Sequence, residues 1–96
     1  MSVLIAGYAR TPFARYAGAL AAVSASELGG HAAAAAIARA GITPDLVDAV
    51  YAGQVLQAAV GQNPARQSAV AADIPLTTPA MTFNAVCLSG TLAIRE

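Results

Sequence analysis

The sequence predicts an α/β fold in which strands and helices alternate along one small domain. Three apolar, β-capable runs lie near residues 2–10, 49–56 and 79–86, and a helix start signal follows each of them. Such alternation predicts a mainly parallel sheet that is covered by helices on both faces. The length of 96 residues leaves room for one domain at most.

The first strand-like run, residues 2–10, is short and apolar and ends at a "TPF" tripeptide, which indicates a strand that leaves into a loop. Beyond this loop, Ser24 and Glu27 have the S-x-x-E spacing of a capping box. In such a box the hydroxyl and the carboxylate satisfy free N–H groups of the first helical turn. The spacing therefore predicts a helix over about 25–40 that stops at Gly41.

The middle of the chain repeats this alternation. Thr43, followed by "PDLVD", predicts a short helix with acidic residues near its positive end. Residues 49–56 are rich in β-branched and aromatic side chains and predict a second strand. Asn63 as N-cap and Pro64 as first helical residue then predict a helix that ends near residue 72.

The last strand, residues 79–86, leads to Cys87, where "CLSGTLAIRE" begins a helix that the chain end cuts off. At this turn, free backbone N–H groups and the positive end of the helix dipole favour a thiolate. The N–H of Cys87 could help to bind an oxyanion, and the small Ser89 and Gly90 would let a substrate carbonyl approach the backbone. The alternative is a buried cysteine that acts as a small apolar residue. Position and residue type leave both interpretations open.

Composition excludes several classes of partner. Five Arg, no Lys and five acidic residues give a net charge of zero, so there is no basic stripe for nucleic acid or for a membrane surface. A single cysteine cannot form an internal disulfide, and the start of the chain lacks the pattern of a signal peptide. The longest apolar run, residues 32–38, falls far short of the roughly 20 residues that span a bilayer. We therefore expect a soluble, cytoplasmic protein.

Small side chains limit the core. Alanine supplies about a quarter of the residues, there is no Trp, and Phe and Tyr together supply five rings. Each alanine buries little area, so much of the apolar content contributes little to stability. We expect a piece of something larger, or an obligate oligomer, whose faces pack against further partners.

The string around the cysteine, "TFNAVCLSG", resembles the nucleophile signature of the thiolases. "IAGYARTPF" and "VYAGQVLQAAVGQNPARQSAVAADIP" are also similar to the N-terminal part of thiolases, so the resemblance covers essentially the whole chain. It implies that Cys87 takes an acyl group from an acyl-coenzyme A and passes it to a second acetyl-CoA carbanion or to free coenzyme A. Ping-pong kinetics follow from such covalent catalysis. Coenzyme A thioesters are substrates, and no metal or bound redox cofactor is implied.

The resemblance also implies that essential groups lie elsewhere. In thiolases an activating histidine, a second cysteine, and an asparagine and histidine near an oxyanion site come from the later part of a chain several times longer. We therefore expect residues 1–96 to be a partial N-terminal thiolase domain, truncated in the nucleophile helix, with Asn84, Ser89 and Gly90 supporting the turn. A full-length protein would be a homodimer or a tetramer. The alternative is a truncated, non-catalytic remnant or interaction fragment that needs a partner chain. A ketoacyl synthase would have different surroundings at its nucleophile.

Three further polar residues have ordinary structural interpretations. His31 is expected to be a partly exposed helix residue and not the missing base. Asn84 is expected to orient the turn through hydrogen bonds, because an amide neither titrates nor attacks. Arg66 more plausibly makes a structural ion pair or a subunit contact than a substrate contact.

Overall fold

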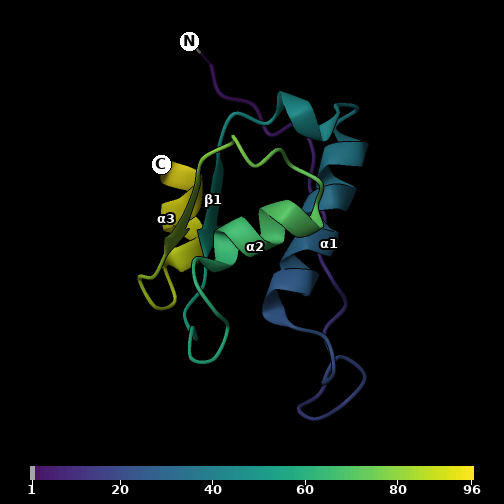
Figure 1. Ribbon diagram of the computed structural model, residues 1–96, viewed down its shortest axis with the longest axis vertical. Helices are drawn as coiled ribbons and strands as arrows, with labels where there is room; N and C mark the ends of the chain where they lie inside the picture. Colours follow the sequence, from purple (N-terminus) through teal and green to yellow (C-terminus); the bar gives the residue numbers. More distant parts are fainter. Residues whose placement is uncertain (1) are drawn as a thin grey trace.

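The α/β class predicted from the sequence is confirmed by a computed structural model that describes residues 2–96 (Figure 1). Strands β1 (Val50–Gly53) and β2 (Ala80–Phe83) pair in parallel, with Val50 opposite Ala80 and Gly53 opposite Phe83. The remaining elements are helices α1 (Ala25–Arg39), α2 (Pro64–Ala71) and α3 (Ser89–Arg95) and the 3-10 helix η1 (Pro44–Leu46).

Helices cover both faces of this small sheet. Val50 packs against the buried cluster formed by Ala69, Ala72 and Ile74, at and just after α2. Gly53 lies on the other face, because side-chain directions alternate along a strand, and there it meets the first residue of α3. Figure 1 shows the strands between α3 on one side and α2 on the other, with α1 packed on α2.

The core is built from small side chains, as the composition suggested. Ala65 and Ala69 on α2 are almost completely buried, and Ile74 is the largest of the buried apolar residues. Close packing of α1 on α2 requires a glycine: a Cβ at Gly30 would lie 2.4 Å from the Cβ of Ala71. Small residues thus let the two helices approach until their backbones nearly touch.

Local end signals are confirmed where the sequence predicted helices. The Ser24 hydroxyl accepts the Glu27 N–H, and the Glu27 carboxylate accepts the Ser24 N–H, which completes the capping box. Gly41 follows α1 with φ +73°, the left-handed conformation that closes many helices. Asn63 caps α2 by accepting the Arg66 N–H, and Pro64 is its first residue.

The predicted first strand, residues 2–10, is wrong in this structure: the segment is extended but forms no strand. Val3 is 95% exposed and Ile5 is 86% exposed. The segment lies against α1 at Gly7, and Arg39 donates a hydrogen bond to the Tyr8 carbonyl at 3.0 Å. A strand exists only where a neighbour completes its ladder, and within residues 2–96 the sheet consists of β1 and β2.

The other elements are shorter than predicted. After Thr43 the chain makes one 3-10 turn, η1, and the Thr43 side chain does not cap it. Strand β1 covers only the first part of the predicted run 49–56, and β2 ends at Phe83 instead of continuing to residue 86. No helix within residues 2–96 has the length and apolar character needed to cross a membrane.

Candidate functional site

Five residues, 84–88, connect β2 to α3 and form a compact turn that we call the nucleophile turn. The Asn84 side chain begins it: its Oδ1 accepts the Val86 N–H at 3.1 Å, which folds the chain back and ends the strand. Its Nδ2 donates to the Val55 carbonyl at 3.1 Å. A single amide therefore shapes the turn and ties it to the segment that follows β1.

Ser89 holds the other end of the nucleophile turn. It is only 4% exposed, and its Oγ accepts the Ala85 N–H at 2.9 Å. The same hydroxyl donates to the Val86 carbonyl at 2.6 Å. Gly53 determines how closely α3 packs on β1, because a Cβ at Gly53 would lie only 2.5 Å from the Ser89 carbonyl carbon. The absence of a side chain at Gly53 therefore lets α3 start directly on β1.

Cys87 lies inside this turn, two residues before the first residue of α3, and not at the start of the helix as predicted. Its side chain is exposed, so the alternative of a buried apolar cysteine does not hold within residues 2–96. The backbone N–H of Cys87 makes no hydrogen bond to the described part of the chain. The turn thus presents an accessible thiol together with a backbone N–H that is free to donate a hydrogen bond to a ligand. Gly90 leaves open space beside the first turn of α3.

Val86 was missed by the sequence analysis. It has φ +51°, in the left-handed region that β-branched residues rarely occupy. Nothing in the sequence signals this conformation, because residues that adopt it readily are Gly, Asn and Asp.

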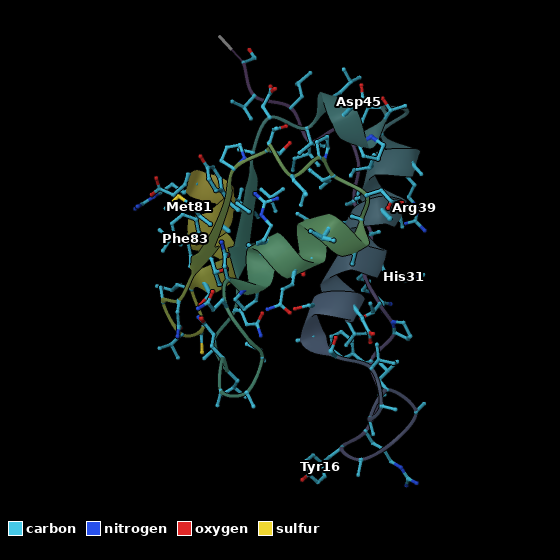
Figure 2. All side chains as sticks on the ribbon, viewed as in Figure 1. Tyr16, His31, Arg39, Asp45, Met81 and Phe83 are labelled. Atoms are coloured by element: carbon cyan, nitrogen blue, oxygen red, sulfur yellow. The ribbon has the colours of Figure 1, made fainter. Side chains whose placement is uncertain are left out.

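The other polar candidates lie away from the nucleophile turn. His31 is exposed on α1, across the molecule from Met81 and Phe83 of β2 (Figure 2). The ion pair expected for Arg66 is not found: within residues 2–96 the guanidinium donates to the Thr78 carbonyl, and its Nη1 is buried without a partner. The described residues hold no group of three His, Cys, Asp or Glu side chains that could bind a metal ion.

A hollow of about 490 Å³ lies between the start of α1 and the segment that follows β1. Leu28, Val55, Leu56 and Ser68 are among its lining residues, and Cys87 is not. One of its lining residues, Val55, is linked to the nucleophile turn, because its carbonyl accepts a hydrogen bond from the Asn84 amide.

Comparison with known proteins gives a consistent result. Residues 3–96 match the family model described as "Thiolase, N-terminal domain". The chain is 49% identical over 92 residues to an acetyl-CoA acetyltransferase of Cupriavidus necator, covering 96% of this chain and 23% of that protein. It is 54% identical over 88 residues to an acetyl-CoA acetyltransferase of Clostridioides difficile, covering 92% of this chain and 82% of that protein.

A solved structure agrees. The Acat5 thiolase of Ascaris suum, determined in complex with coenzyme A, superimposes with a TM-score of 0.92 at 36% identity. The match covers 95% of this chain and 24% of that one. The chain thus spans about a quarter of the length of this structure and of the Cupriavidus relative. Sequence, fold and family model agree, and the chain belongs to the thiolase family, with residues 3–96 corresponding to its N-terminal domain.

Proposed function

We propose that this chain is the N-terminal portion of an acetyl-CoA C-acyltransferase and that Cys87 carries the acyl group as a thioester. The observation that carries the proposal is the exposed Cys87 thiol, held between Asn84 and Ser89 in the string that resembles the thiolase nucleophile signature. Two relatives match this chain over 96% and 92% of its length, and both are named acetyl-CoA acetyltransferases.

In the proposed reaction the Cys87 thiolate attacks the carbonyl carbon of an acyl-CoA thioester. The new C–S bond forms a tetrahedral intermediate, and in this proposal the Cys87 N–H binds its oxyanion. Collapse of the intermediate breaks the bond to coenzyme A, whose thiolate leaves and takes up a proton. In the second half-reaction the carbanion of a second acetyl-CoA attacks the acyl-cysteine, forms the new C–C bond of a 3-ketoacyl-CoA and regenerates the Cys87 thiolate. In the degradative direction the Cys87 thiolate attacks the 3-keto carbon of a 3-ketoacyl-CoA, the C–C bond breaks, the acetyl-CoA carbanion leaves and takes up a proton, and free coenzyme A then removes the acyl group from Cys87.

We infer that the histidine and second cysteine that thiolases use for these proton transfers come from outside residues 2–96. His31 is the only histidine of the sequence, and it is exposed on α1, which packs on the far side of α2 from α3. Cys87 is the only cysteine. The chain therefore contributes the acyl carrier and its turn, and coenzyme A thioesters are the proposed substrates.

The test is to replace Cys87 in the native protein that carries this chain. Wild-type protein incubated with acetyl-CoA should gain the mass of one acetyl group, and Cys87→Ala and Cys87→Ser should gain none. Because the side chain is exposed within residues 2–96, both variants should unfold at the wild-type temperature. A Cys87→Ala protein that still forms an acyl-enzyme, or turns over at the wild-type rate, would disprove the assignment.

The alternative, a non-catalytic interaction fragment, draws support from the exposed apolar side chains of the described chain. Val3, Leu4, Ile5 and Phe13 are all more than 80% exposed, and surfaces of this kind normally mark contacts with other protein. The intact mass of the native product distinguishes the two. A product much heavier than 9.5 kDa supports the enzyme, whereas a product of 9.5 kDa that releases no acetyl-CoA from acetoacetyl-CoA supports the fragment.

We also propose that the native protein is a homodimer or a tetramer. Tyr51 is 41% exposed and Met81 is 53% exposed on neighbouring strands of the sheet face that α3 partly covers. This apolar sheet face is a candidate for the subunit contact, whereas α2 turns its buried alanines and Arg66 toward the chain's own core.

A further inference from the structure

We propose that Val86 is a positioning residue for the acyl transfer, and that its left-handed backbone aims the N–H of Cys87 at the oxyanion. This inference rests on the proposed function, because it assigns a role in that reaction to a residue that does not touch the substrate. The two statements remain separable by experiment.

The conformation of Val86 is imposed by its neighbours. The Asn84 Oδ1 holds its N–H at 3.1 Å, and the Ser89 Oγ holds its carbonyl at 2.6 Å. The Ser89 backbone N–H reaches the same carbonyl at 3.1 Å. The Val86 side chain is 64% exposed, so packing does not explain why φ is +51°. A strained backbone that is fixed on both sides by side chains is typical of functional sites.

The consequence for Cys87 follows from the planarity of the peptide bond. The Val86 carbonyl and the Cys87 N–H belong to one peptide unit and point in opposite directions, because the unit is planar and trans. Ser89 draws the carbonyl toward α3, so the Cys87 N–H must point away from α3. This agrees with the finding that the Cys87 N–H has no acceptor within residues 2–96. If Val86 relaxed to a negative φ, the peptide would rotate and the donor would be lost.

A double-mutant cycle of Ser89→Ala and Val86→Gly in the native protein separates the backbone strain at Val86 from the hydrogen bond by which the Ser89 hydroxyl holds it. With valine at position 86, removal of the Ser89 hydroxyl lets the strained residue relax. We then expect kcat to fall about a hundredfold, the size of effect seen when one oxyanion donor is lost. Glycine adopts φ +51° without strain. In the Val86→Gly background, Ser89→Ala should therefore lower kcat by less than about tenfold. The KM for acetyl-CoA should not change, because the donor acts on the transition state.

A matched control relieves strain at another position. Ala17 also has a positive φ, +56°, and lies in the loop before α1. Ala17→Gly should not rescue Ser89→Ala, so a rescue by Val86→Gly alone cannot be attributed to higher overall stability. If Ser89→Ala lowers kcat equally with valine and with glycine at position 86, the positioning role is wrong.

The unfolding temperature gives a readout that does not depend on activity. Val86→Gly should raise Tm by roughly 2 to 4 °C, and Ser89→Ala should lower Tm less in its presence. If the effects of Val86→Gly and Ser89→Ala on Tm are coupled but no Cys87-dependent acylation occurs, the strained turn is supported and the proposed function is wrong. If Cys87-dependent acylation occurs but the two mutations are coupled neither in kcat nor in Tm, the proposed function is supported and the role of Val86 is wrong.

Discussion

Two turns of this chain each lead into a helix through a non-glycine residue with a positive φ, and they differ in the strain at that residue and in the role of its side chain. Asn63 precedes α2 with φ +44°, and Val86 lies before α3 with φ +51°. Asparagine tolerates this region and valine does not. The same backbone geometry is therefore nearly without strain in one turn and strained in the other.

The Asn63 side chain uses its hydrogen bonds to hold the fold together. Its Oδ1 accepts the Arg66 N–H at 3.4 Å and the Thr82 hydroxyl at 2.8 Å, and its Nδ2 donates to the Ala80 carbonyl at 3.0 Å. These contacts join the start of α2 to β2, and Pro64 and Ala65 follow as buried residues. The turn at Asn63 therefore stabilises the fold.

The nucleophile turn is arranged in the opposite way. The Val86 side chain binds nothing polar, and Asn84 and Ser89 satisfy its backbone. The next two residues, Cys87 and Leu88, are exposed. The nucleophile turn is strained and exposed, whereas the turn at Asn63 caps a helix and leads into buried residues. This difference indicates that the nucleophile turn is specialised for presenting a reactive group.

The largest effect should come from Gly53→Ala, because Gly53 joins the nucleophile turn to the sheet. The new Cβ would meet backbone atoms of Ser89 and Gly90 at 2.5 to 2.7 Å, so α3 would have to move away from β1. We expect the free energy of unfolding to fall by about 3 kcal/mol, as for overpacked sites. Because Ser89 moves with α3, kcat should fall as well. Urea denaturation and steady-state kinetics on the native protein measure both.

Gly90→Ala is the control for Gly53→Ala. It adds the same methyl group to the first turn of α3, where, apart from the backbone of α3 itself and the two neighbouring residues, a Cβ meets nothing of the described chain within 4 Å. It should leave the free energy of unfolding unchanged or raise it by about 0.5 kcal/mol, because alanine favours a helix. Equal losses of stability in the two variants would contradict the packing explanation.

The next effect tests the other turn. Asn63→Ala removes the cap of α2 and the partner of Thr82, so the free energy of unfolding should fall by about 2 kcal/mol. The kcat should stay close to wild type, because the side-chain hydrogen bonds of Asn63 go to Ala80, Arg66 and Thr82 and not to the nucleophile turn. Asn63→Gly separates the contributions: it keeps the positive φ but loses the hydrogen bonds. A fall in kcat without a fall in stability would show that the two turns are not functionally distinct.

The sequence was most informative where the determining contacts are local. The capping box at Ser24 and the Asn63 cap both depend on residues within three positions, and both are confirmed. Residues 2–10 have strand-like side chains, but a ladder depends on a partner that the local pattern does not specify. The φ of Val86 depends on Asn84 and on Ser89 together, and valine by itself argues against it. The same contacts end β2 early and move the start of α3 from Cys87 to Ser89.

The smallest change in stability, with a distinct change in activity, is expected for Asn84→Ala. Asn84 is exposed within residues 2–96, so the loss of its two hydrogen bonds should lower the free energy of unfolding by less than about 1 kcal/mol. Val86 would nevertheless lose the acceptor of its N–H, and we expect kcat to fall about tenfold with KM unchanged. Gln54→Ala is the matched control, because Gln54 is a partly exposed amide whose Nε2 donates to the Leu56 carbonyl and not to a residue of the nucleophile turn. If both variants lower kcat equally, then loss of order after β1, and not release of Val86, explains the effect. If Asn84→Ala keeps the wild-type kcat, the Ser89 hydroxyl alone is enough to hold the turn.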